Sequence, residues 1–302
     1  MAKSASRLVR DLHQQNIIKL FDKVDQSHSR WQTWADFVVM AAIAISNTVD
    51  KAHAEEREKQ YLAIAGKYRP KDLQFFAEIL AEVVAGMEQN PDQDFLGEMY
   101  MALELGNDHA GQFFTPYNVC RMMAKMTYGD VLTAQIERDG WISVNDPACG
   151  AGALLVAFAN ECLERKINYQ TSVLFVAQDV DFIVGCMCYL QLSILGCPGY
   201  VTIDNTLTHP QTSHDGRGLI PVDSGNVWYT PFYFRAEWQM RRLVESMRRF
   251  LPGTQAPKLE ATPAELPAAE QEPPQEQMPE PQAPPIIELN VNDAGQYSLF
   301  EV

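Results

Sequence analysis

The stretch VNDPACGAGALL, residues 144–155, decides the expected fold of this chain. A short apolar run, residues 141–144, precedes the turn, and a helix-forming run follows it. Between the two runs lie Asp146, Gly150 and Gly152. Glycines between a strand and a helix let the backbone turn sharply and approach a ligand closely. The stretch therefore predicts a strand, a ligand-binding turn and a helix.

The composition is that of an ordinary globular protein. The chain has 302 residues, of which 46% are hydrophobic and 21% are charged, enough for one sizeable core or two modest ones. No secretory signal is expected, and the longest apolar run, residues 37–45, is too short to span a bilayer. The six cysteines show neither Cys-x-x-Cys spacing nor cysteine–histidine pairs. Reduced thiols, no metal site and a cytoplasmic location are therefore expected.

The net charge of −15 argues against a simple nucleic-acid binder, but the charge is spread unevenly. Residues 251–302 hold nine acids and one lysine, so this tail carries −8 and the rest of the chain −7. Ten of the 18 prolines lie in the same tail. Such a segment cannot bury enough apolar surface to offset its ordering entropy, so residues 251–302 are expected to be a disordered tether.

Two regions precede the tail. Residues 1–105 are predicted to form a helical domain, because apolar residues recur there at helical spacing. In residues 106–250 short strands alternate with helices, which predicts an α/β domain with a parallel sheet covered on both faces. Strands are expected at 141–145, 173–178 and 200–203, and helices at 7–24, 30–49, 70–87, 117–126, 153–165, 182–195 and 231–251.

The acid that opens the central turn selects among possible ligands. Asp146 stands at the end of a strand, where its carboxylate repels a phosphate and attracts an amine or a sulfonium. A cationic nucleoside is therefore a better ligand than a nucleotide, and S-adenosylmethionine fits that description. The alternative is an Asp-Pro turn whose glycines serve packing alone.

The next two strands supply further polar residues for such a ligand. Asp179 ends the second strand, where an acid in a doubly wound sheet can accept both ribose hydroxyls. Asp181 is the competing candidate, although its position favours the start of the next helix. Asn205 follows the third strand, so its loop is expected to lie over the adenine ring, with Asn205 at the base edge.

Four segments, in this order, resemble the N6-adenine DNA methylase family, and most of all the modification subunits of type I restriction systems. They are GQFFTPYNV (111–119), DPACGAGALL (146–155), AQDVD (177–181) and DNTL (204–207). The resemblance covers residues 95–232. It implies a Rossmann-like S-adenosylmethionine-dependent methyltransferase sheet that serves methyl transfer to adenine N6 in DNA. The motif residues that it assigns to the cofactor are Phe114, Thr115, Pro116, Asp146, Ala148, Gly150, Gly152 and Asp179.

The same resemblance points to catalytic residues, with one departure. Methylation of an exocyclic amine needs the base flipped out of the stack, and the family holds that amine with an [N/D]-P-P-[Y/F] loop after its fourth strand. The nearest counterpart here is Tyr229-Thr230-Pro231-Phe232, in which Tyr229 occupies the asparagine position. These four residues are the candidate catalytic residues. The alternative is that the element is lost and that Asn226 is merely nearby.

The sheet is expected to be incomplete. Too few residues separate Phe232 from the tail for the three further strands of a full sheet, so one edge must be covered or paired. The following helix is expected to cover that edge with Phe234, Trp238, Val244 and Met247. Self-association or a partner chain is the other way to complete the sheet. The arginines of this helix are candidate phosphate contacts to DNA, the alternative being a solvated basic helix end: Arg241, Arg242, Arg248 and Arg249.

The end of the tail contains a second motif. In GQYSLFEV (295–302), the segment Gln296-Tyr297-Ser298-Leu299-Phe300 resembles the peptide that docks on bacterial sliding clamps. An extended peptide of this kind binds through pocket anchors, with Leu299 and Phe300 in an apolar cleft and Gln296 at its rim. The alternative is that this patch packs on the body of the protein.

Two functions are compatible with these motifs. The first is an S-adenosylmethionine-dependent DNA adenine methyltransferase, completed by self-association or by a partner chain. The second is a catalytically silent relative that binds cofactor or DNA and acts as an adaptor at the sliding clamp. The resemblance favours the first function, whereas Tyr229 and the missing strands favour the second.

Overall fold

A four-stranded sheet lies at the centre of the computed structural model, which describes residues 11–24, 27–103, 114–222 and 226–250 and the strand pair 290–291 with 297–298. The strand order is β1 (Ile142–Asp146), β2 (Val173–Asp179), β3 (Gly199–Ile203) and β4 (Val227–Tyr229). β1, β2 and β3 run parallel, and β4 runs antiparallel to β3. The three expected strands are confirmed, with ends shifted by one residue.

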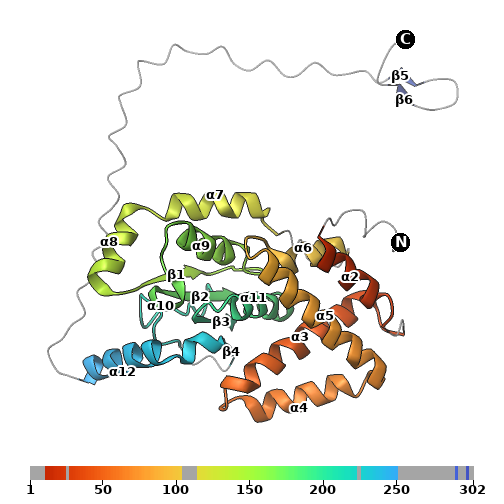
Figure 1. The fold of residues 1–302 in the computed structure, drawn as a ribbon, viewed down its shortest axis with the longest axis horizontal. Helices are drawn as coiled ribbons and strands as arrows, with labels where there is room; N and C mark the ends of the chain where they lie inside the picture. The colour runs from red at the N-terminus through yellow and green to blue at the C-terminus, as the bar shows by residue number, and fades with distance from the viewer. Residues whose placement is uncertain are drawn as a thin grey trace. The chain divides into compact units, whose positions relative to one another are not determined.

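Helices connect the parallel strands and cover both faces of the sheet. α9 (Ala153–Glu164) and α11 (Phe182–Ile194) lie on one face, and α7 (Tyr117–Thr127) packs on α9 (Figure 1). α8 (Asp130–Asp139) leads into β1, and the short α10 (Tyr169–Ser172) leads into β2. The 3-10 helix η1 (Pro231–Phe234) and α12 (Ala236–Phe250) contribute Tyr233 and Trp238 to the apolar cluster on the opposite face.

The pleat of β2 divides its side chains between two cores. Phe175 belongs to the large core beneath α9 and α11, whereas Val176 belongs to a smaller cluster with Tyr200 and Trp238. Successive side chains of a strand point to opposite faces, and both faces of this sheet are covered. The continuous apolar run of β2 follows from burial on both sides.

Five described helices of the N-terminal part pack beside the sheet. They are α2 (Leu12–Phe21), α3 (Arg30–Val49), α4 (Ala54–Ala65), α5 (Pro70–Gln89) and α6 (Phe95–Ala102). Asp11 and Ser29 cap α2 and α3 by accepting from backbone amides of the first turn, and a proline begins α5. α3 packs on α11, and the helices share the large core with the sheet. The described residues up to 250 belong to one compact unit, and the expected boundary at 105–106 lies outside the described residues.

A buried arginine fixes the helical part to β4. Arg57 on α4 donates to the Val227 carbonyl at 2.8 Å, and its guanidinium lies 4.1 Å from the centroid of the Trp228 ring. Asp50 lies 2.8 Å from the same guanidinium. Breaking a buried ion pair leaves an uncompensated charge, so the contact specifies where the helices dock.

α12 touches the body of the protein through one side only. Trp238 is fully buried and meets Trp141 edge-on with 5.8 Å between the ring centroids, and Phe234 packs on the same cluster. Val244 and Met247 are instead 41% and 55% exposed. The expectation that they cover the sheet edge is wrong, because Trp238 turns the opposite side of the helix toward the body. β1 pairs with β2 alone among the described strands, so its other edge has no strand partner there.

The tail forms a second unit, residues 253–302. Its described backbone is an antiparallel pair, β5 (Asn290–Val291) with β6 (Tyr297–Ser298). The remainder of the expected tether, including Gln296, Leu299 and Phe300, lies outside the described residues. Within the described parts of the chain, no helix has the length and apolar character needed to cross a membrane.

Candidate functional site

The turn after β1 requires glycine at two positions. Gly150 and Gly152 have φ values of 55° and 95°, in the left-handed region that favours glycine. A Cβ atom at Gly152 would lie 2.8 Å from Sγ of Cys188. The turn therefore brings the backbone into α9 along a path that no larger residue follows without strain.

Two acids meet at the mouth of this turn. Asp179 accepts from the Gly150 amide at 2.8 Å through Oδ2 and from the Asp181 amide at 2.9 Å through Oδ1. Asp146 accepts from the Ala148 amide at 3.2 Å. Burial, reinforced by the nearby charge of Asp179, raises the pKa of the Asp146 carboxyl. A cation placed between the two carboxylates would relieve their repulsion.

Asp181, the competing candidate, has a different role. Its carboxylate caps α11 by accepting from the Ile183 amide at 2.8 Å and the Val184 amide at 3.0 Å. A side chain that satisfies two amides of a helix start is a structural cap. Of the two acids at the end of β2, Asp179 is the one that faces the glycine turn.

The loop after β3 closes against the same turn. The Thr206 hydroxyl donates to the Pro147 carbonyl at 2.5 Å, and the Asp204 amide donates to the Asp179 carbonyl at 3.0 Å. Asn205 is exposed, and its Oδ1 accepts from the Leu207 amide at 2.9 Å. The structure thereby brings the ends of β1, β2 and β3 together at one edge of the sheet.

Two exposed apolar side chains at this edge were not singled out by the sequence. Val180, directly after Asp179, is 73% exposed, and Leu207 in the loop after β3 is 94% exposed. Their positions beside Asp179 and Asn205 were the available signal. Apolar side chains held in solvent next to polar groups are suited to contact the faces of a flat ring.

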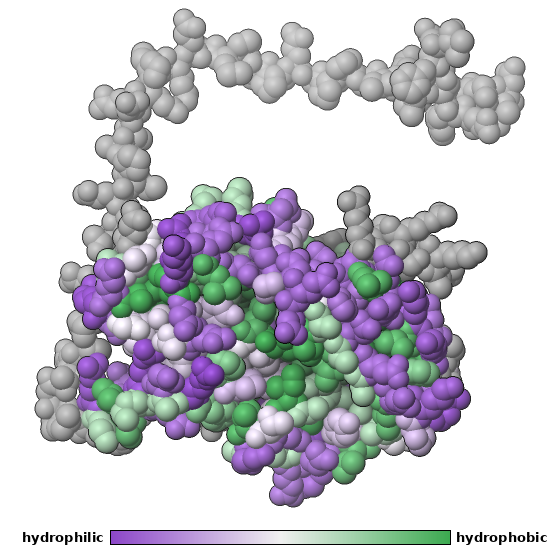
Figure 2. Space-filling view, viewed as in Figure 1, coloured by the Kyte–Doolittle hydropathy of each residue, from purple (hydrophilic) through white to green (hydrophobic). Residues whose placement is uncertain are grey.

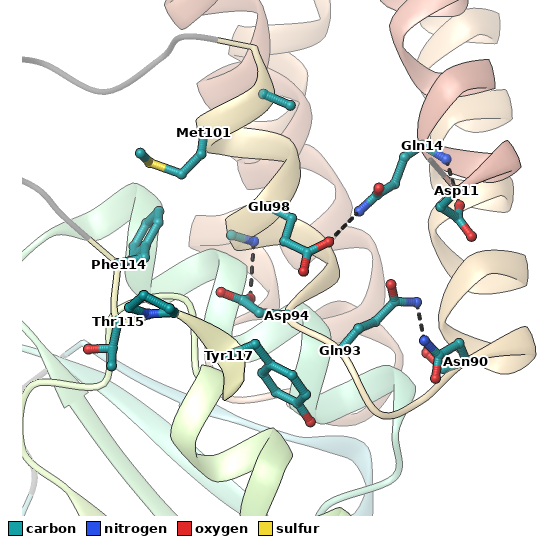
Figure 3. A pocket seen from close by; sticks show the side chains of 13 residues that line it. Asp11, Gln14, Asn90, Gln93, Asp94, Glu98, Met101, Phe114, Thr115 and Tyr117 are labelled. Atoms are coloured by element: carbon teal, nitrogen blue, oxygen red, sulfur yellow. Dashed lines mark hydrogen bonds between the residues drawn. The ribbon is translucent and has the colours of Figure 1, made fainter. Parts of the chain in front are cut away.

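Phe114 and Thr115 lie in the segment before α7, across from Asp94 of the helical part (Figure 3). The Phe114 ring packs edge-on against Tyr100, with 5.3 Å between centroids. The same ring lies 3.4 Å from the point where a Cβ at Gly150 would stand. The Phe114 ring therefore lies beside the glycine turn.

Phe114, Thr115 and Pro116 also line a pocket of about 640 Å³ (Figure 3). Carboxylates of the helical part, from Asp11, Asp94 and Glu98, line its other side. Asp94 caps α6 by accepting from the Gly97 amide at 3.1 Å, and burial raises the pKa of its carboxyl. The pocket is therefore acidic on the side of the helical part, and none of the described residues that line it belongs to the glycine turn.

Gln191 is a further residue that sequence reasoning missed. This fully buried side chain on α11 donates to Asp94 and to the Ala151 carbonyl, both at 2.8 Å, and accepts from the Leu96 amide at 3.2 Å. It therefore ties the glycine turn to α6. The signal was a lone amide in an otherwise apolar helix, because a buried polar side chain needs partners.

The four candidate catalytic residues lie at the other end of the sheet. β4 runs antiparallel to β3, so its end meets the beginning of β3. Thr230 accepts from the Gly199 amide at 3.0 Å and donates to the Cys197 carbonyl at 2.7 Å. Tyr229 stacks on Tyr233 with 4.8 Å between ring centroids. Contrary to expectation, the structure does not bring residues 229–232 to the glycine turn.

The arginines of α12 also depart from expectation. Arg241 donates to the carbonyls of Thr171 at 2.6 Å and Gly140 at 3.1 Å, and Arg242 donates to the Tyr233 carbonyl at 2.8 Å. Burial lowers the pKa of both guanidiniums, which stay charged at neutral pH. These side chains are used within the fold rather than offered to phosphate.

The other two arginines expected to contact phosphate lie at the end of α12. Arg248 is exposed, whereas the side chain of Arg249 lies outside the described residues. Among the described residues, no group of three His, Cys, Asp or Glu side chains is arranged to hold a metal ion.

Parallel strands whose ends carry a glycine turn and paired acids define a mixed α/β protein with a candidate cofactor site at the sheet edge. The family model for N-6 DNA methylase matches residues 91–264, more than half of the chain. The chain therefore belongs to the N-6 DNA methylase family, as the motifs implied. The matched segment begins before α6 and contains the glycine turn, Asp146, Asp179 and the loop after β3. The search of curated proteins found no match.

Proposed function

We propose that this chain binds S-adenosylmethionine at the ends of β1, β2 and β3 and serves the methylation of adenine N6 in DNA. The observation that carries the proposal is the pair of carboxylates, Asp146 and Asp179, at the mouth of the Gly150 turn. The sulfonium and ammonium of this cofactor are cationic, and a partly buried negative site attracts them more strongly than water does.

Each part of the cofactor has a counterpart at the edge. A carboxylate offers about four acceptor positions, and Asp179 uses two for backbone amides. The remainder are available to the ribose hydroxyls. Val180 and Leu207 would hold the faces of the adenine, with Asn205 at the base edge. The methionine end would extend past Phe114, Thr115 and Pro116 toward the acidic pocket.

Activation of the target amine needs a group that the position of residues 229–232 does not supply. We therefore propose that methyl transfer by this chain requires a second chain, or residues outside the described ones, to hold the flipped adenine. A catalytically silent adaptor is the second candidate, favoured by the packing of Tyr229 against Tyr233. A methyl-transfer assay separates them, since only the first candidate gains activity when the completing chain is added.

Calorimetric titration tests the cofactor proposal. Asp146→Asn should weaken S-adenosylmethionine binding at least tenfold, yet hardly change the affinity for methylthioadenosine, which lacks the cationic groups. Asp139→Asn is the matched control, because Asp139 pairs with Arg138 on the exposed end of α8. Equal losses for both ligands would show that Asp146 holds the loop and does not select charge.

A second measurement concerns transfer itself. The purified chain is incubated with tritiated S-adenosylmethionine and unmethylated DNA, at a concentration that saturates the cofactor site. We expect bound cofactor without label in DNA. Labelled N6-methyladenine from the chain alone would contradict the requirement for a completing group.

We also propose that the end of the tail recruits the chain to a bacterial sliding clamp. The sequence Gln296-Tyr297-Ser298-Leu299-Phe300 supports this proposal through its anchors, Leu299 and Phe300. A tether raises the effective concentration of the folded part near its binding site. Leu299→Ala with Phe300→Ala should abolish retention on immobilised clamp, whereas Glu301→Ala should not. Retention of the double variant would refute the motif.

A further inference from the structure

α12 turns an apolar side toward solvent and its arginines toward the body of the protein. Four apolar residues, which we name the α12 stripe, are exposed: Met240 by 60%, Leu243 by 48%, Val244 by 41% and Met247 by 55%. Figure 2 shows hydrophobic side chains over α12 at the lower left. The residues turned toward the body include Trp238, Arg241 and Arg242.

Such an arrangement is unusual for a surface helix. The apolar side of a surface helix ordinarily faces the core and the charged side faces water. Here the half-buried guanidiniums of Arg241 and Arg242 contact carbonyls and rings, which fixes the orientation of the helix. The helix cannot rotate to bury its stripe without breaking these contacts and exposing Trp238. The stripe therefore needs burial by something outside the described body.

The spacing of the stripe is that of a helix–helix interface. Its members stand at positions i, i+3, i+4 and i+7, which follow one side of a helix over about two turns. A second helix with the same spacing packs against such a seam, and a copy of α12 offers one of the same length. Self-complementary surfaces of this kind form two-fold symmetric dimers.

The charges beside the stripe match an antiparallel copy. Glu237 and Arg248 are eleven positions apart, about three helical turns, so both lie along the same flank of the stripe. In an antiparallel pair of identical helices, the same flank of each copy faces the other. The start of one helix then lies beside the end of its partner. Glu237 of one copy then lies opposite Arg248 of the other, twice per dimer, as flanking charges do in helix pairs.

We propose that the α12 stripe is the contact between two copies of this chain, with the two α12 helices packed antiparallel. The contact leaves the glycine turn free, and it does not depend on the proposed function. A single helix pair buries a small area, so the dimer should dissociate in the micromolar range.

Sedimentation of the full chain over a range of concentrations tests the proposal. We expect a monomer–dimer equilibrium. The double variant Val244→Glu with Met247→Glu should raise the dissociation constant of the dimer at least tenfold. These side chains face solvent, so the melting temperature of the diluted monomer should not fall. The control is Met126→Glu, because Met126 is 78% exposed on α7 and outside the stripe. A natural chain that stays monomeric, or a dimer indifferent to the stripe variants, overturns the proposal.

Charge reversal tests the antiparallel arrangement. Glu237→Arg alone and Arg248→Glu alone should each weaken the dimer, because each places like charges opposite one another. The two together should restore the natural dissociation constant. If the double variant is as weak as the single ones, the antiparallel pair is wrong.

Cross-linking gives an independent readout. All six natural cysteines are buried, so an added surface thiol is the reactive one. Leu243→Cys lies near the two-fold axis and should form a disulfide-linked dimer. Two copies of Glu237→Cys should not, since they stand about 20 Å apart in this arrangement. Cross-linking of both variants would indicate a parallel pair and contradict the proposal.

Discussion

Asp179, at the end of β2, accepts a hydrogen bond at 2.8 Å from the amide of Gly150, in the turn after β1. One carboxylate thus joins two segments that meet only in the folded sheet. The bond also orients the turn, whose left-handed glycine would otherwise have many conformations. A site held in this way loses little conformational entropy when a ligand binds.

Replacing each of the two acids at the end of β2 should separate binding from stability. Asp179→Ala leaves the Gly150 amide without its acceptor, so we expect the affinity for S-adenosylmethionine to fall at least tenfold. Asp181→Ala removes the cap of α11 and should lower the free energy of unfolding by about 1 kcal/mol with affinity nearly unchanged. Calorimetry and thermal melting of both variants check this. The reverse pattern would assign the ligand to Asp181.

Gly152→Ala should damage the turn. The left-handed φ of 95° and the 2.8 Å approach to Sγ of Cys188 both oppose a side chain. We expect the free energy of unfolding to fall by about 2 kcal/mol. Cofactor binding should no longer be measurable. Gly129→Ala is the matched control, because no atom lies within 4 Å of a Cβ there. Chemical denaturation of the two variants makes the comparison, and equal stability would contradict the requirement for glycine.

Cofactor affinity should depend on pH through Asp146. Because the pKa of its carboxyl is raised by burial, the ionised form that attracts a cation is lost at a higher pH than for an ordinary aspartate. Below that pKa, each unit of pH should weaken binding by about tenfold. Titrations between neutral and acidic pH measure the slope, and Asp146→Asn should flatten it.

The effect of the same carboxyl on folding has the opposite sign. A raised pKa in the folded state means that folding favours the protonated acid. The contribution of Asp146 to stability is therefore present at low pH and is lost as the pH rises through the folded pKa. Bound cofactor should offset this loss, so the ligand-induced rise in melting temperature should grow toward neutral pH.

Tyr229→Asn should not create a methyltransferase. Tyr229 ends β4, where it pairs with Tyr200 near the start of β3 and away from the glycine turn, and it stacks on Tyr233. We expect no label transferred to DNA and a loss of about 2 kcal/mol in the free energy of unfolding, because an aromatic contact is replaced by a polar side chain. Tyr229→Phe keeps the ring and should retain most of the stability. Methylation by Tyr229→Asn would return this segment to the site.

The local elements of the fold were predictable from the sequence. The strand at 173–179 and the helices at 153–164 and 182–194 follow from apolar runs and periodicity, which are properties of neighbouring residues. The glycine turn was predictable as well, because left-handed backbone leaves few choices besides glycine. The meeting of Asp146, Asp179 and the loop after β3 followed from one rule, that parallel strands end at the same edge.

The arrangement of the last segments was not predictable in the same way. No strand was expected at residues 227–229, and their sequence contains nothing that states which edge of the sheet they join or in which direction. The position of this strand depends on Arg57, which is 170 positions away in the sequence. Arg57 donates to the Val227 carbonyl only once the helices have docked. Gln191 is a comparable case, since its partners Asp94 and Ala151 come from two other segments.

By itself, the sequence determined the glycine turn, the three parallel strands and the helices that follow the first two of them, and that an acid opens the central loop. The tertiary structure alone decided the direction of β4 and therefore the distance of residues 229–232 from that loop. It also decided which side of α12 faces outward, because the burial of Trp238 outweighs the apolar character of the stripe. The local sequence pattern determines the conformation of each segment. Which segments become neighbours depends on burial and strand pairing between distant residues, and these interactions form only in the assembled core.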